Sequence, residues 1–384
     1  MRVARPRVGS TGARVKITAI EAIPITVPIK SELVISSARG THDVSPFVIV
    51  RVQTDEGVTG LGEVSCTPIW SGEDQVTAVH FIATILAPAL IGRSPLEIEP
   101  IRTAMHRVLA ANPFTKAAIE TACWDILGKV AGLPLYRLWG GPVRERVPIK
   151  FSLSGIEPGR VTRVAEYALG LGFRAMKVKV GGDPEADIRR YRAVREVIGP
   201  DIRLGADANG GWTVRQAIDT VRRLEEYGLW FIEQPVPPGD PTRLAEVRAA
   251  TRTPLLADES VSTPEDAMAL IRAGAADALS AYVGMGAGLD AVRRIGVIAR
   301  AGGIGCTLGS NLELGIASAA MTHLAAATHD LTCEAWPPDI LGPLYYEADV
   351  LAEPLDIRDG SVGLPTAPGL GIELDEAVIA RYRR

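Results

Sequence analysis

Apolar and polar side chains alternate along residues 15–64 of the chain. The runs VKITAIEAIPITVPI (15–29) and FVIVRVQTDEGVTGLGEV (47–64) place every second side chain on an apolar face, which is the period of a β-strand. Within the second run, the segment Asp55-Glu56-Gly57 has the composition of a hairpin turn. The pattern therefore predicts antiparallel strands in this part of the chain.

The pattern changes to helical spacing over residues 73–139. The runs HFIATILAPALIG (80–92) and AAIETACWDILGKVAGL (117–133) carry apolar residues at i, i+3 and i+4, which is typical of amphipathic helices. Gly132 and Pro134 are expected to end the second helix. Strands and helices together predict a small α+β domain over residues 15–140.

From residue 141 onward, short β-rich runs recur, each followed by a helical pattern. The gaps between successive run ends are 24 to 28 residues, and eight strand–helix units at an even period are typical of a (β/α)8 TIM-like barrel. A doubly wound open sheet is the alternative, but no GxGxxG follows a strand. The predicted strands are 149–155, 175–180, 202–208, 230–235, 254–260, 278–283, 303–310 and 331–336. We expect an α/β chain with the barrel over 141–354 and a segment 355–384 that returns to an α+β capping domain.

Composition narrows the class of protein. The 384 residues contain 41 Lys and Arg against 45 Asp and Glu, a net charge of −4, so a nucleic-acid or anionic-membrane partner is not expected. The longest apolar run, Phe81–Gly92, is too short to cross a bilayer. Residues 1–14 are interpreted as a loose N-terminal extension. The scattered cysteines favour a reducing cytoplasm and exclude a Cys-based zinc site; they are Cys66, Cys123, Cys306 and Cys333.

Charged residues stand at the ends of successive predicted barrel strands, where barrel active sites form. Lys177 and Lys179 lie two apart on one strand and therefore point to the same side. Asp207, Glu233 and Asp258 end the next three strands. A single Asp at a strand end is usually a helix cap, but three converging carboxylates would repel one another without a cation. Oxygen-only ligands favour Mg²⁺ over Zn²⁺, so we predict a magnesium site.

Two neighbours of these carboxylates are open to more than one interpretation. Asn209 shares the face of Asp207 and is either a contact for the ligand or a turn residue. Glu259 alternates away from Asp258 and either supports the metal ligands or forms a structural ion pair.

The motifs around these positions resemble the enolase superfamily, specifically its muconate lactonizing enzyme subgroup. The similarity covers nearly the whole chain. It rests on KVKVG (177–181), GADANGGW (205–212), FIEQP (231–235), LADES (256–260), ACWDILGKVAGLPLYRLWGG (122–141) and GSNLELGIASAAMTHLAAA (309–327). The resemblance implies a Mg²⁺-dependent barrel, with Mn²⁺ as a substitute, and a capping domain that closes the site. It also implies proton abstraction next to a carboxylate, giving an enolate held on the metal, and a homo-oligomer.

Carried over by position, the resemblance assigns roles to five residues. Asp207, Glu233 and Asp258 match the metal ligands. Lys179 matches the acid/base on the second strand. Lys177 matches the lysine beside it, which holds the substrate carboxylate and favours loss of the proton from its partner.

The sixth strand departs from the subgroup, which usually carries a second lysine there. Tyr282 stands at that position, and no Lys, Arg or His occurs from 273 to 292. No histidine occurs from 107 to 322, which excludes the mandelate-racemase-like arrangement with a seventh-strand His. Tyr282 is interpreted as a weak acid, a hydrogen-bond donor or a packing residue.

Further candidates lie in loops around the expected barrel mouth. The capping-domain loops at 36–42 and 68–70 are expected to close the site, with Arg39 meeting an anionic group or water and Trp70 forming a substrate wall or packing in the core. Ser310 and Asn311 follow the seventh strand near a helix N-terminus suited to an anion. Glu334 ends the eighth predicted strand and is expected either at the site or in a structural role.

The sequence thus predicts a cytoplasmic, Mg²⁺-dependent isomerase or lyase that acts on a small carboxylate. With Lys179 as the only base, cycloisomerisation or syn β-elimination (dehydration) is favoured. The alternative within enzymes is a racemase or epimerase of N-acyl amino acids or dipeptides. The alternative from another class is a non-catalytic metal-binding barrel.

Overall fold

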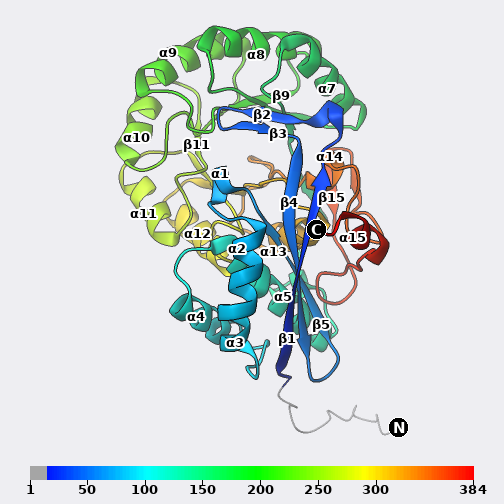
Figure 1. Cartoon of the computed structure of the whole chain (residues 1–384). Coiled ribbons are helices and arrows are strands. Elements are labelled where there is room, and N and C mark those ends of the chain that lie inside the picture. The colour runs from blue at the N-terminus through cyan, green and yellow to red at the C-terminus, as the bar shows by residue number, and fades with distance from the viewer. Residues whose placement is uncertain (1–14) are drawn as a thin grey trace, which may run out of the picture.

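The computed structural model describes residues 15–384, and the expectation for residues 1–14 lies outside them (Figure 1). The capping domain is built on an antiparallel sheet in the order β1 (Ile17–Pro28), β4 (Val44–Thr54) and β5 (Thr59–Ser65). The hairpin predicted at Asp55-Glu56-Gly57 is confirmed, and Gly57 supplies the positive φ of the turn. Pro24 lies in β1, an edge strand, where its missing N–H costs no ladder hydrogen bond.

Helices cover one face of this sheet. The long α5 (Pro113–Ala131) packs directly on β5, and Gly62 permits the contact because a Cβ there would lie 1.9 Å from the Ala118 carbonyl oxygen. Gly132 ends α5 in the left-handed conformation, as predicted. The other helices are α1 (Pro68–Ser71), α2 (Gln75–Phe81), α3 (Ala87–Leu90), α4 (Ile98–Val108) and α6 (Leu135–Leu138), with a π-helical turn over Ile82–Leu86.

A hairpin of the cap reaches over the barrel. It consists of β2 (Ile35–Ser37) and β3 (Gly40–His42), preceded by a 3-10 turn at Ser31–Leu33. In Figure 1 this hairpin lies inside the arc of barrel helices, beside the strands that they surround. Its position brings the loop of residues 35–42 to the barrel.

The barrel consists of parallel strands surrounded by helices, as predicted. Seven strands are hydrogen-bonded in chain order: β7 (Phe151–Leu153), β8 (Ala175–Lys179), β9 (Arg203–Asp207), β10 (Ile232–Glu233), β11 (Leu255–Ala257), β12 (Ala278–Ala281) and β13 (Gly305–Leu308). The helices that follow them are α7 (Pro158–Gly170), α8 (Pro184–Ile198), α9 (Val214–Leu224), α10 (Pro241–Ala250), α11 (Pro264–Arg272), α12 (Leu289–Ala301) and α13 (Gly315–Ala327), with a 3-10 turn at Glu225–Tyr227.

The barrel helices begin where the sequence carries start signals. α7, α8, α10 and α11 each start with proline, whose fixed φ suits the first helical position. The preceding residue accepts a backbone hydrogen bond with its side chain in each case. No helix within residues 15–384 is long and apolar enough to cross a bilayer.

The prediction of an eighth strand at 331–336 is wrong. This segment forms turns, although it fills the eighth position: the Thr332 amide donates to the Cys306 carbonyl on β13, and the Lys150 amide beside β7 donates to the Pro338 carbonyl. Pro337 and Pro338, which directly follow this segment, have no N–H to donate, so a regular ladder cannot continue through them.

The C-terminal segment contacts both parts of the chain. After α14 (Gly342–Tyr345), β14 (Ile357–Arg358) pairs with β15 (Ser361–Gly363), and β15 pairs with β6 (Arg146–Pro148) ahead of the barrel. α15 (Glu376–Tyr382) packs on β1, and Arg51 forms an ion pair with Glu376. The domain limits at 140 and 354 stay a prediction.

Candidate active site

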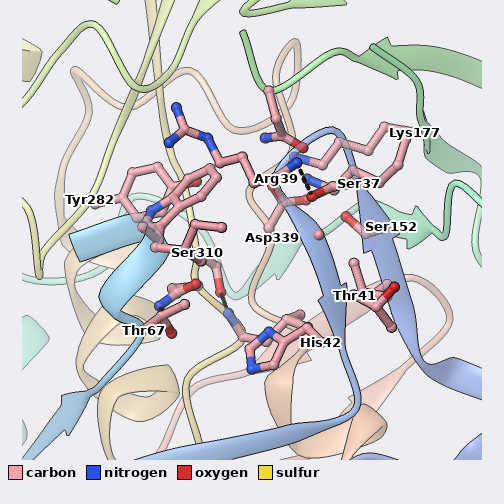
Figure 2. A pocket seen from close by; sticks show the side chains of 18 residues that line it. Ser37, Arg39, Thr41, His42, Thr67, Ser152, Lys177, Tyr282, Ser310 and Asp339 are labelled. Atoms are coloured by element: carbon pink, nitrogen blue, oxygen red, sulfur yellow. Dashed lines mark hydrogen bonds and ion pairs between the residues drawn. The ribbon is translucent and has the colours of Figure 1, made fainter. Parts of the chain in front are cut away.

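A cavity of about 280 Å³ lies between the carboxyl ends of the barrel strands and the cap hairpin (Figure 2). The barrel contributes Lys177, Lys179, Asn209, Tyr282, Ser310 and Asn311 of the residues expected there, and the cap contributes Arg39 and Trp70. The remaining lining residues are Ile35, Ser37, Gly40, Thr41, His42, Thr67, Ile69, Ser152, Leu312 and Asp339.

Both lysines of β8 point inward and bind carboxylates. The Lys177 Nζ lies 2.6 Å from Glu233 Oε1, 2.8 Å from Asp339 Oδ2 and 3.1 Å from Asp207 Oδ2. The Lys179 Nζ lies 2.6 Å from Asp207 Oδ2. Burial alone would lower the pKa of Lys177, but the surrounding carboxylates outweigh burial and raise it well above its ordinary value. Lys177 is therefore a permanent cation of the site.

The three carboxylates predicted as metal ligands lie at the ends of neighbouring strands. Asp207 and Glu233 are paired across β9 and β10, Asp258 directly follows β11, and all three side chains are fully buried. Burial and the charge of Asp207 raise the pKa of Glu233 to about 8, and burial together with Glu259 raises that of Asp258. Without a further cation, burial and mutual repulsion therefore favour a proton on these two carboxyl groups.

The fit of a metal ion can be judged from these oxygens. Glu233 Oε2 and Asp258 Oδ1 are buried without a hydrogen-bond partner, and the donors are all oxygen, the ligand type that Mg²⁺ prefers. Within residues 15–384, however, no three His, Cys, Asp or Glu side chains converge closely enough to enclose a metal ion. The Lys177 ammonium lies between Asp207 and Glu233 instead. The donor chemistry fits Mg²⁺, and its binding requires the lysines to release the carboxylates.

Tyr282 lies across the cavity from Lys177 (Figure 2). Its hydroxyl donates a hydrogen bond of 3.0 Å to Asp258 Oδ2, and its ring contacts Trp70 at 6.2 Å between centroids. Gly309 makes room for this ring, since a Cβ there would lie 2.0 Å from Tyr282 Cε2. Burial, followed by the charge of Asp258, raises the pKa of Tyr282 well above its ordinary value. Tyr282 is therefore a neutral donor.

A buried carboxylate, Glu259, joins the cap to the barrel through two residues that line the cavity. Glu259 Oε1 lies 3.3 Å from the Arg39 Nε and accepts a hydrogen bond of 3.2 Å from the Asn209 side chain. The Arg39 guanidinium also stacks over the Trp70 ring, 4.8 Å from its centroid. Glu259 thus forms the ion pair that the sequence left open, and Asn209 is positioned by it.

The expectation that Glu334 lies at the site is wrong. Its side chain is 67% exposed and pairs with Arg144 outside the cavity. Asp339, five residues later, lines the cavity and also pairs with buried Lys150 at 3.3 Å. The even spacing of the strands pointed to Glu334 because it assumed a regular eighth strand. The only sequence signal for Asp339 was an acidic residue directly after Pro337-Pro338.

Comparisons with known proteins agree with this fold and site. Residues 19–140 match the mandelate racemase / muconate lactonizing enzyme N-terminal domain, and residues 160–378 match the enolase C-terminal domain-like family. The chain belongs to the mandelate racemase / muconate lactonizing enzyme family of the enolase superfamily, and it is an enzyme of that superfamily.

Similar proteins carry out more than one reaction. The chain is 33% identical to an N-succinyl-L-Arg/Lys racemase of Bacillus cereus, over 94% of this chain and 96% of the relative. It is also 33% identical to muconate cycloisomerase 1 of Rhodococcus opacus, over 96% of this chain and 97% of the relative. Among solved structures, a Pseudomonas fluorescens muconate lactonizing enzyme complexed with muconolactone matches with a TM-score of 0.92, 31% identity and coverage of 97% and 100%. An Enterococcus faecalis dipeptide epimerase complexed with Mg and the dipeptide L-Leu-L-Tyr matches with a TM-score of 0.87 and 32% identity. The match covers 93% of this chain and 99% of that structure.

Proposed function

We propose that this enzyme removes the α-proton of a small carboxylate with Lys179 and completes the reaction by cycloisomerisation or syn β-elimination. The observation that carries the proposal is the asymmetry of the cavity: a lysine pair lines one side, and Tyr282, bound to Asp258, lines the other. Of these two sides, only the lysine side carries a basic nitrogen.

The two lysines have different tasks in this proposal. Lys177 keeps its proton and holds the substrate carboxylate by a charge-assisted hydrogen bond. Lys179, once it has released Asp207 and lost its proton, takes the α-proton on Nζ while the electron pair of the C–H bond stays on the substrate as an enolate. In elimination that pair forms the new C=C bond, and the leaving group on the same face departs with the proton from Lys179. Lys179 is neutral again at the end. Cycloisomerisation uses the same steps in reverse: a carboxylate oxygen of the substrate adds to its C=C bond, the π electrons form the enolate, and protonated Lys179 gives its proton to the α-carbon.

We assign Asp207, Glu233 and Asp258 to one Mg²⁺, with Mn²⁺ as a substitute. The unpartnered carboxylate oxygens and the all-oxygen donor set support this assignment, as does the Mg named with two related dipeptide epimerases. When bound, the cation would offset the negative charge that grows on the substrate carboxylate as the α-proton leaves.

The second candidate is a racemase or epimerase of N-acyl amino acids or dipeptides. The names of several relatives favour it, including an L-Ala-D/L-Glu epimerase of Bacillus subtilis. Inversion needs a proton donor on the face opposite Lys179, and in this cavity that donor would have to be Tyr282.

The experiment is exchange of the substrate α-proton in D₂O, followed by NMR with Mg²⁺ present. A library of small carboxylates that includes N-acyl amino acids and dipeptides would be incubated with wild type and with Lys179→Ala. We expect exchange of at least one acid by wild type and its loss in Lys179→Ala. No exchange from any acid in such a library would contradict the proposal.

We also propose a cytoplasmic location for the enzyme. Free buried thiols at all four cysteines fit a reducing cytoplasm. The homo-oligomer stays a prediction, to be checked by sedimentation of the full chain.

A further inference from the structure

The wall of the cavity changes character with distance from the lysines. Lys177 and Asp339 lie at one end, whereas His42 and Thr67 lie at the other (Figure 2). Asn311 belongs to the far end as well, because its side-chain nitrogen donates a hydrogen bond of 2.9 Å to the Thr67 hydroxyl. The far end is therefore built from neutral polar groups of the cap and of the loop after β13.

The hydrogen bonds at the far end leave one donor and one acceptor free. The Asn311 nitrogen is used by Ser65 and Thr67 at 3.1 and 2.9 Å, so its carbonyl oxygen is left, and no described residue donates to it. The Thr67 hydroxyl accepts from Asn311, and no described residue accepts its proton. A substrate group that both accepts and donates a hydrogen bond satisfies both positions.

His42 adds a third neutral polar surface. Its Nε2 lies 2.7 Å from the Ser45 hydroxyl, which contacts the buried Tyr346 hydroxyl at 2.8 Å. These contacts fix the ring against the cavity. Burial lowers the pKa of His42, so the ring is neutral near pH 7.

The far end offers no uncompensated cation. Arg39 is the cation that the cap brings to the cavity, and it already pairs with buried Glu259 and stacks on Trp70. A carboxylate bound beside His42 and Thr67 would lose its hydration without gaining an opposite charge, which is costly. An alkyl group would leave the Thr67 hydroxyl and the Asn311 carbonyl without partners.

We propose that the substrate is a small monocarboxylate whose end remote from the reacting carbon carries a neutral hydroxyl or primary amide. This group hydrogen-bonds to Thr67 and Asn311 beside His42, while the carboxylate binds at Lys177. The inference rests on the proposed function, because it assumes that Lys177 and Lys179 mark the reacting end. A cavity of about 280 Å³ is of a size suited to a small acid.

The test compares acids of equal chain length that end in hydroxyl, amide, methyl or carboxylate. Exchange of the α-proton in D₂O gives kcat/KM for each with the Mg²⁺-loaded enzyme. We expect the hydroxyl- or amide-ended acid to exchange at least tenfold faster than the methyl- and carboxylate-ended acids, since a site built to hydrogen-bond a group discriminates against analogues that lack it. Equal or faster exchange of the methyl- or carboxylate-ended acid would overturn this inference and leave the proposed function intact. Lack of exchange from all four acids and from the wider library would overturn both.

Substitutions at the far end of the cavity test which residues cause the preference for a hydroxyl-ended acid. Thr67→Val and His42→Asn are expected to bring the ratio of hydroxyl-ended to methyl-ended kcat/KM toward one, mainly through a higher KM for the hydroxyl-ended acid. Thr84→Val, an exposed threonine on the outer surface of the cap, is the matched control and should keep the wild-type ratio. Unchanged ratios in both cavity variants, with wild-type melting curves, would overturn the assignment.

Discussion

The phenolic oxygen of Tyr282 lies 3.0 Å from Oδ2 of Asp258, and the hydroxyl donates a hydrogen bond to that carboxylate. The hydroxyl of Tyr282, which lines the same cavity as Lys179, is therefore already used as a donor, and its raised pKa keeps it neutral. Stereochemistry follows from this contact, because racemisation needs proton exchange on both faces of the substrate carbon.

We predict that any substrate exchanges its α-proton with retention of configuration and epimerises only slowly. A single enantiomer in D₂O would be followed for deuterium content by NMR and for optical rotation at the same time. Tyr282→Phe should exchange within tenfold of wild type. If rotation is lost as fast as deuterium enters, Tyr282 is a competent acid/base and the racemase or epimerase assignment replaces ours.

Replacing Lys179 and replacing Lys177 should change the kinetics in different ways. Lys179→Ala removes the base and should lower exchange by roughly 10²–10⁴, the usual contribution of a positioned base. Lys177→Ala removes the cation that holds the carboxylate and should raise KM as well as lower kcat. Steady-state kinetics and D₂O exchange separate these effects, and Lys16→Ala, on the exposed edge of the cap, serves as the control. Persistent exchange in Lys179→Ala would assign the base elsewhere.

The metal assignment can be tested by metal binding, which needs no known substrate, and by activity once a substrate is found. Binding of Mg²⁺ measured by calorimetry should weaken at least tenfold in Glu233→Gln and in Asp258→Asn, because each loses a buried anionic donor. Glu334→Gln, which alters an exposed carboxylate outside the cavity, should bind as wild type does. EDTA should abolish activity, and Mg²⁺ or Mn²⁺ should restore it. Full activity of metal-free Asp207→Ala would contradict the metal assignment.

A buried carboxylate of the cap predicts how stability depends on pH. Glu63 on β5 accepts hydrogen bonds from the Leu314 and Ala317 amides at the start of α13, at 2.7 and 3.2 Å. Burial, with further repulsion from Glu313 and Asp349, raises its pKa from 4.5 to about 8. The folded state therefore holds a proton that the unfolded state has lost, and this contribution to stability declines as pH rises from about 4.5 to about 8.

Urea unfolding of wild type and Glu63→Gln across this range would measure the effect. Relative to the variant, wild type should lose a few kcal/mol of unfolding free energy as pH rises. Glu313 and Asp349 titrate in both proteins, so the difference reports Glu63 together with its electrostatic coupling to these two carboxyl groups. Parallel stability curves would show that the pKa of Glu63 is not raised.

Local rules were sufficient for much of the site. The two-residue spacing of Lys177 and Lys179 fixed their common direction, because side chains alternate along a strand. Asp207, Glu233 and Asp258 were found because the carboxyl ends of parallel strands lie together. The sequence could not reveal which oxygens the ammonium groups bind. Lys177 contacts three carboxylates, and only folding brings these three together.

Other features depend on contacts between distant segments. Asp339 was missed because residues 331–336 form turns in place of the regular strand whose period pointed to Glu334. The contact of Glu63 with the Leu314 amide joins residues 251 positions apart, and no local pattern signals it. The free donor and acceptor at Thr67 and Asn311 likewise appear only when the cap loop meets the loop after β13.

The close fit between Gly309 and the Tyr282 ring constrains how this site could change during evolution. Any larger residue at 309 collides with the ring, while a lysine at 282 would leave the space of the ring unfilled. A route to a two-lysine site therefore passes through substitutions whose effects depend on one another, and Gly309→Ala should be tolerated only after Tyr282 has been replaced. The order of the substitutions, as much as their identity, decides whether each intermediate folds.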